Sequence, residues 1–227
     1  MPRDPRKHQK ALMKKRSKQK AALQRKSHQQ EFTSLSPQAI IRRARTFPLL
    51  ECLITANWQQ NNTGMAQILL ARQQPDGDIC FGSYLVDMYC LGLKNTFANA
   101  GFSRTRYENE IHNKLFPEAE TEACPVELAH QMIYASIEYA AQFGFTPEKD
   151  FALSQYLLAP RGELEEPYQL TFGKDGKPFF VAGPRDNSAR IIKQLEKTAG
   201  PGNTIPPSRA RRSQRARFRN MTSLART

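Results

Sequence analysis

The side chain best placed for metal or acid chemistry is Asp87, in the apolar run YLVDMYC at residues 84–90. Strand alternation would put its carboxylate on a largely apolar face, where a partner must offset the loss of hydration. A functional interpretation is a strand carboxylate that binds Mg²⁺ in a nuclease, with possible companions Asp78, Glu108, Glu110 and His112. A structural interpretation is an aspartate that caps residues 91–94 or pairs with Lys94. We favour the structural interpretation because no second strand carboxylate is spaced to share a metal.

The histidines and cysteines offer fewer possibilities. His112 lies in a polar segment and is predicted to be exposed, whereas His130 lies on an apolar helix and is predicted to be buried and hydrogen-bonded. The cysteines form no CxxC pair and no Cys/His cluster, so the sequence predicts reduced, mostly buried thiols at Cys52, Cys80, Cys90 and Cys124. We predict no metal and no cofactor, and assign no catalytic residue, with Asp87 and His112 as the only candidates.

Charge is distributed very unevenly along the chain. Residues 1–47 carry 14 Lys and Arg against two acids, and residues 200–227 carry seven Arg and no acid. The intervening residues 48–199 carry 13 basic and 19 acidic residues. The excess of positive charge therefore belongs to two arms, and the central part is acidic.

The arms have the composition of segments that bind a phosphate backbone. Arginine grips phosphate with a planar fork and stacks on bases, and the tract around Phe218 resembles arginine-rich segments that fold on RNA. The predicted nucleic-acid-binding residues are Arg3, Lys7, Lys10, Lys14, Lys15, Arg16, Lys18, Arg42, Arg43, Arg45, Arg209, Arg211, Arg212, Arg215, Arg217 and Arg219. Trp58 could stack on a base, but a single Trp more often fills a core.

Three functions are compatible with these features. The first is a non-catalytic protein that binds RNA or a ribonucleoprotein such as the ribosome, because no helix-turn-helix, zinc finger or ribbon reader is recognisable. The second is a metal-dependent nuclease that uses Asp87. The third is an adaptor whose acidic core contacts a protein partner inside a nucleoprotein assembly. No run of about 18 apolar residues and no signal peptide is present, so we expect a cytoplasmic protein without a membrane partner.

The elements that must position these residues predict an α+β fold. Residues 1–35 form a basic arm that is helical or disordered, residues 36–199 a single domain, and residues 200–227 an Arg-rich disordered tail. Apolar, β-rich runs at 65–73 and 79–90 flank the turn sequence QPDGD, which predicts a hairpin covered on both faces. A second hairpin is predicted from residues 168–172 and 178–182 around the turn GKDGK. Two hairpins would supply one small sheet.

About four to six helices should cover this sheet. Ser36 and Pro37 begin a short amphipathic helix, and Pro125 to Phe143 reads as a central buried helix that stops at Gly144. A further helix is predicted from residue 146 to about residue 158. One or two short helices are expected within residues 93–116, and Asp186 is expected to cap the last helix.

Four short motifs resemble those of a set of bacterial proteins of unassigned function. They are LVDxxCLGxK at residues 85–94, GFxP at 144–147, FGxDGKP at 172–178 and GPxD at 183–186. The resemblance spans about residues 50–195 and leaves out both arms. It implies a bacterial cytosolic origin and a single domain, and it assigns no catalytic residue.

Overall fold

A five-stranded antiparallel sheet forms the centre of the protein in the computed structural model. Four strands follow one another in the chain: β1 (Leu49–Thr55), β2 (Met65–Gln73), β3 (Ile79–Asp87) and β4 (Gly92–Phe102). The short strand β5 (Thr121–Ala123) returns to the free side of β1, which gives the order β4-β3-β2-β1-β5. The structure describes residues 9–10, 13–20, 35–60, 63–116, 120–163, 167–183, 186–200 and 205–209.

The hairpin of β2 and β3 confirms the first hairpin prediction. Its strands pair from Met65 with Asp87 to Gln73 with Ile79. The turn closes because the Gln74 N–H donates to the Asp78 carbonyl at 2.8 Å and Gly77 adopts a φ of 97°. Apolar side chains on both faces of these strands required cover on both sides, which the helices provide.

Two other strand predictions were wrong. Residues 92–102 form the edge strand β4 instead of helix, and the helices expected there begin only at Arg104. Residues 168–172 form no strand, because the Gln131 side chain holds both the N–H and the carbonyl of Tyr168. The strand β6 (Phe179–Ala182) pairs in parallel with β7 (Ile205–Arg209), inside the segment predicted to be a disordered tail.

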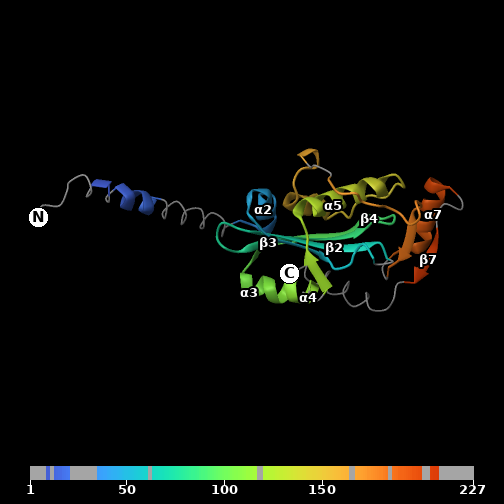
Figure 1. The fold of residues 1–227 in the computed structure, drawn as a ribbon, viewed down its shortest axis with the longest axis horizontal. Coiled ribbons are helices and arrows are strands. Elements are labelled where there is room, and N and C mark those ends of the chain that lie inside the picture. The colour runs from blue at the N-terminus through green and yellow to red at the C-terminus, as the bar shows by residue number, and fades with distance from the viewer. Residues whose placement is uncertain are drawn as a thin grey trace, which may run out of the picture.

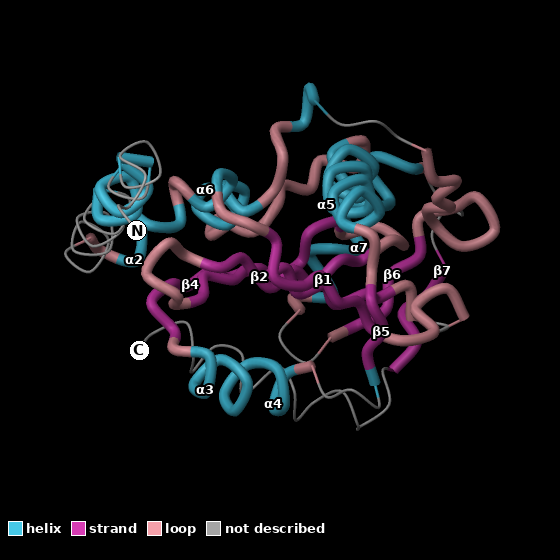
Figure 2. Tube along the Cα trace, turned by 60° about the vertical axis from the view of Figure 1, so that its left-hand side comes forward, coloured by secondary structure: helices cyan, strands magenta, loops and turns pink. Residues whose placement is uncertain are grey.

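Helices cover both faces of the sheet (Figures 1 and 2). One face carries α2 (Pro37–Ile41), α5 (Val126–Ala141) and α6 (Phe151–Ser154), and the other carries α3 (Arg104–Tyr107), the π-helical turn η2 (Glu108–His112) and α4 (Asn113–Leu115). Each face has its own apolar core. The α5 side includes Ile68, Leu70 and Tyr84, and the α3 side includes Leu69 and Phe81.

Short helices join these layers at their ends. They are the 3-10 turns η1 (Ala44–Thr46), η4 (Gln155–Leu157) and η5 (Arg161–Glu163). The helix predicted over residues 146–158 is therefore shorter than expected, since only α6 and η4 form within it. The Ser36 cap of α2 is confirmed by its hydroxyl, which accepts a hydrogen bond from the Ala39 N–H at 3.3 Å. No described helix is long and apolar enough to cross a membrane.

The last helix, α7 (Ser188–Ala199), packs at one end of the sheet beside β6 (Figure 1). Its cap is Asn187, whose side chain accepts a hydrogen bond from the Arg190 N–H at 3.1 Å, so the prediction that Asp186 caps it was wrong. Leu195 of α7 packs with Phe143 and Phe180 in a third apolar cluster. This cluster fixes α7 against the end of α5.

Candidate functional site

Asp87 is a buried residue that organises the turn after β3. Its side chain is part of a residue only 1% exposed, and Oδ1 accepts hydrogen bonds from the N–H groups of Tyr89 at 2.8 Å and Cys90 at 3.1 Å. Burial raises the pKa of Asp87 to about 6, while the charge of Lys94 and the backbone N–H groups oppose that rise. These contacts match the structural interpretation of Asp87.

The proposed metal companions of Asp87 are not gathered around it. Asp78 precedes the opposite end of β3, and Glu108 and Glu110 lie on η2 at the other side of the sheet. In the part of the chain that the structure describes, no three His, Cys, Asp or Glu side chains are grouped so as to hold a metal ion. The arrangement offers no donor set for metal-dependent hydrolysis.

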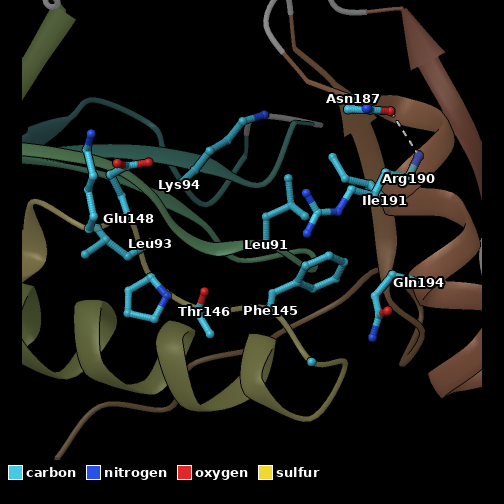
Figure 3. Close-up of a pocket in the computed structure, with 13 residues that line it drawn as sticks. Leu91, Leu93, Lys94, Phe145, Thr146, Glu148, Asn187, Arg190, Ile191 and Gln194 are labelled. Carbon is cyan, nitrogen blue, oxygen red and sulfur yellow. Dashed lines mark hydrogen bonds between the residues drawn. The ribbon is translucent and has the colours of Figure 1, made fainter.

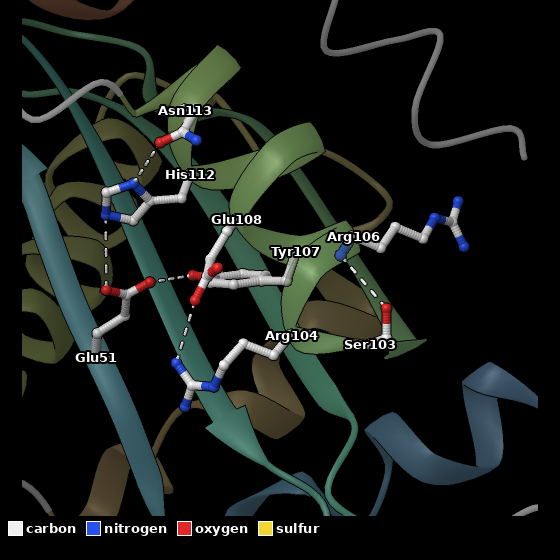
Figure 4. A network of polar contacts seen from close by, with 8 residues as sticks. All are labelled: Glu51, Ser103, Arg104, Arg106, Tyr107, Glu108, His112 and Asn113. Carbon is white, nitrogen blue, oxygen red and sulfur yellow. Dashed lines mark hydrogen bonds and ion pairs between the residues drawn. The ribbon is translucent and has the colours of Figure 1, made fainter.

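His112 lies in a polar network between η2 and β1 (Figure 4). Its Nε2 is 3.8 Å from Oε2 of Glu51, and the Tyr107 hydroxyl donates to Oε1 of the same carboxylate at 2.5 Å. Burial, and then the hydrogen bond to Glu51, raise the pKa of Tyr107. π-helical turns recur at functional sites, but here the imidazole and the phenol both contact one carboxylate, which ties η2 to β1.

His130 is buried on α5, as predicted, but is not fully hydrogen-bonded. Its Nε2 has no hydrogen-bond partner among the described residues. Burial, together with the nearby charge of Arg72, lowers the pKa of His130 to about 4. The imidazole is therefore neutral near pH 7 and is packed in the core.

The N-terminal cations that the structure describes are exposed. Residues 13–20 are helical, and every side chain along them is open to solvent, as is that of Lys10. This exposed helix carries Lys14, Lys15, Arg16 and Lys18. Other predicted nucleic-acid-binding residues lie outside the described residues, namely Arg3, Lys7, Arg211, Arg212, Arg215, Arg217 and Arg219. Arg209 ends β7.

The three arginines that follow α2 differ in their surroundings. Arg42 and Arg43 are exposed, and the Arg42 guanidinium lies 5.7 Å from the centre of the Tyr156 ring. Arg45 is half-buried and donates to the carbonyls of Leu158 at 2.5 Å and Gln155 at 3.1 Å. Arg45 therefore holds η4 in place within the fold, in addition to any contact with phosphate.

A cleft of about 600 Å³ separates α7 from the loop that follows α5 (Figure 3). Three segments far apart in sequence supply its walls: residues 91–94, residues 144–149 and the first two turns of α7. Side chains of both charges reach into it. Its lining residues are Leu91, Leu93, Lys94, Gly144, Phe145, Thr146, Pro147, Glu148, Lys149, Asn187, Arg190, Ile191 and Gln194.

A buried ion pair forms one side of this cleft. Lys94 Nζ donates to Oδ2 of Asp186 at 2.5 Å, with side chains 15% and 11% exposed, and the Gly183 N–H donates to the same oxygen at 2.7 Å. The sequence analysis offered Lys94 as a partner of Asp87, but its ion pair is with Asp186. Gln194 fixes the other side, because its amide donates to the Phe143 carbonyl at 2.8 Å.

Sequence reasoning missed this cleft, although its parts were visible. Three of the four motifs noted above contribute to it, since LVDxxCLGxK supplies Lys94, GFxP supplies Phe145, and GPxD supplies the Asp186 that pairs with Lys94. Arg190 and Glu148 carried no sequence signal at all. Only the fold brings these residues together.

A smaller hollow of about 260 Å³ lies beside Trp58. The Trp58 ring is partly buried against the α5-side core, so the prediction that it fills the core holds. Tyr89 and Gln169 line the same hollow. No charged residue lines it, so it offers no contact for a phosphate.

No protein-family model, curated protein or solved structure matches the chain. Function is therefore argued from the residues of this chain alone.

Proposed function

We propose that the protein binds RNA, alone or within a ribonucleoprotein such as the ribosome, through contacts of its basic arms with the phosphate backbone. The observation that supports this best is the separation of charge. Residues 48–199 carry six more acids than bases, whereas the cations of the helix at residues 13–20 are all exposed. A phosphate backbone can reach these cations without contacting the acidic domain.

The contacts that join the arm to the domain favour the same function. Arg42 and Arg43 extend the basic surface onto the domain itself, because both lie on the exposed side of the segment that follows α2. Their backbone is held in place by the burial of Ile40, Ile41 and Ala44 beneath them. A bound strand would thus be anchored at a fixed point on the domain.

We propose binding without catalysis. The carboxylate of Asp87 already caps a turn, and the described residues hold no group of metal ligands. The polar network of Glu51 and His112 contains no Ser or Cys nucleophile. Backbone contacts position a protein on nucleic acid without reading its sequence, so we expect little sequence preference.

The test is the salt dependence of RNA binding by the full chain. A fluorescein-labelled single-stranded RNA is titrated and followed by fluorescence anisotropy between about 50 and 200 mM KCl. If the arms neutralise ~6 to 10 phosphates, affinity falls by roughly 10³ to 10⁵ over this range. Replacing Lys14 and Lys15 together by Gln should lower the slope of log Kd against log salt by about 1.5 to 2.

A matched double variant supplies the control. Lys193 and Lys197 are exposed on α7, so their replacement by Gln removes the same charge from the domain. This variant should leave the salt slope unchanged. Binding that does not depend on salt, or an equal loss of slope in both double variants, would contradict a role for the arm.

A further inference from the structure

The cleft between α7 and residues 144–149 combines three kinds of surface. Lys149 and Arg190 bring positive charge to it, and Glu148 brings a carboxylate. Apolar side chains, including Phe145 and Ile191, complete its lining. Figure 3 shows Arg190 and Glu148 reaching into the cleft from opposite walls, with Phe145 between them.

The charges of the cleft are unequal in their availability. Lys94 is paired with Asp186, so each largely neutralises the other. The guanidinium of Arg190 forms no hydrogen bond or ion pair with any described residue; only its backbone N–H is bonded, to Asn187. Arg190 and Lys149 against Glu148 leave one surplus positive charge. That balance suits a small anion better than an uncharged ligand.

From this arrangement we propose that the cleft binds a free mononucleotide. Arginine and lysine are the side chains that hold phosphate, and a carboxylate accepts hydrogen bonds from ribose hydroxyls. The apolar lining around Phe145 offers a surface for the flat face of a base. The volume of about 600 Å³ lies within the range of small-molecule sites.

The same features disfavour a nucleic-acid strand as the occupant. A continuous backbone would bring several phosphates past Glu148, which repels them, whereas one terminal phosphate group can lie beside Arg190 alone. None of the cations of this cleft belongs to the basic arms. The inference thus concerns a second site and does not rest on the proposed binding of RNA.

The structure also explains why the cleft keeps its shape without a ligand. The ion pair of Lys94 and Asp186 joins the beginning of β4 to the segment before α7. The Gln194 amide joins α7 to the end of α5, and the Glu148 N–H donates to the Leu93 carbonyl at 3.2 Å. All three walls are tied to one another, so little ordering is needed on binding.

The test is calorimetric titration of the full chain with ADP, adenosine and inorganic phosphate. We expect ADP to bind at least tenfold more tightly than adenosine or phosphate alone, because only ADP engages both the cations and the apolar surface. Arg190→Gln should weaken ADP binding at least tenfold, which is the effect of losing a charge-assisted hydrogen bond. Arg190 is exposed, so this variant should retain the fold.

Lys193→Gln is the control, since Lys193 lies on the same helix, is exposed and does not line the cleft. It should change ADP affinity less than twofold. Absence of ADP binding at millimolar concentration, or equal losses in Arg190→Gln and Lys193→Gln, would overturn the proposal. So would RNA binding that depends on Arg190 in a protein that does not bind ADP.

The variant with Lys14 and Lys15 replaced by Gln separates this site from the arms. We expect it to lose RNA affinity and to bind ADP like the unmodified protein. If it binds RNA normally while Arg190→Gln still loses ADP, the role of the arm fails and the mononucleotide site stands.

Discussion

Replacing Asp87 by asparagine tests whether this buried carboxylate is structural. Burial raises the pKa of Asp87 from 3.8 to about 6, so the folded protein binds a proton there more tightly than the unfolded chain does. The resulting stabilisation is fully present below pH 3.8 and is lost as the pH rises through about 6. A rise of about two pKa units, at ~1.4 kcal/mol each, corresponds to about 3 kcal/mol of unfolding free energy.

Asparagine escapes this loss because it carries no charge. Its carbonyl oxygen can still accept from the N–H groups of Tyr89 and Cys90, which Asp87 now caps. We therefore expect Asp87→Asn to match the unmodified protein near pH 4, and to be more stable by up to about 3 kcal/mol near pH 7.5. Asp87→Leu should instead lose about 2 kcal/mol or more, because it leaves both N–H groups without an acceptor.

The assay is urea unfolding followed by the fluorescence of Trp58, repeated from about pH 4 to pH 8. The difference between two variants at each pH isolates Asp87 from the other titrating groups. An Asp87→Asn protein that is less stable by more than about 1 kcal/mol near pH 7.5 would refute the reasoning. A difference in stability that does not change with pH would refute it equally.

Three further predictions follow from contacts in the core and at its edge. His130, with its pKa lowered to about 4, should cost the fold up to about 3 kcal/mol as the pH falls from 6.5 through 4, and His130→Leu should remove that acid sensitivity in the same unfolding assay. Arg45→Gln should lower the free energy of unfolding by about 1 to 3 kcal/mol, because two carbonyls lose their donor, and should leave RNA affinity unchanged. Cys52 and Cys124 face each other across β1 and β5, where the Cys124 N–H donates to the Cys52 carbonyl at 2.9 Å and the thiols contact one another. Oxidation by diamide should join these two thiols, with the loss of two hydrogens measured by mass spectrometry, and a disulfide that forms elsewhere would contradict the strand register.

The elements that sequence predicted correctly are those whose signals are local. The hairpin of β2 and β3 has apolar residues on both faces and a turn with Pro75, Asp76 and Gly77. Helix α5 lies between Pro125 and Gly144, which mark its ends. In both cases, the residues that define the element also determine its neighbours in the chain.

Strand β4 lacks such a signal because it does not alternate regularly. Its pairing with β3 is interrupted between Leu85 and Val86 and again between Ile79 and Phe81, so buried positions occur in pairs along it. As an edge strand it also tolerates polar residues such as Asn95 and Asn99, which read as helix or loop. The failed second hairpin has a tertiary cause, since Gln131 of α5 binds the backbone of Tyr168.

The cleft could not be predicted because its chemistry depends on partners chosen by the fold. Lys94 was offered to Asp87 on grounds of proximity in sequence, and Asp186 was offered to a helix N-terminus. The structure pairs these two residues with each other across 92 positions and leaves the cap to Asn187. No periodicity or spacing in the sequence encodes that exchange.

The order of the strands shapes the folding of the nascent chain. Because β1 to β4 are consecutive, all four can pair before α5 has been synthesised. During that interval the sheet face that bears Ile68, Leu70 and Tyr84 lacks the helix that later buries it. Such a surface attracts other unfinished chains, so the protein should depend on chaperones during translation more than its final form suggests.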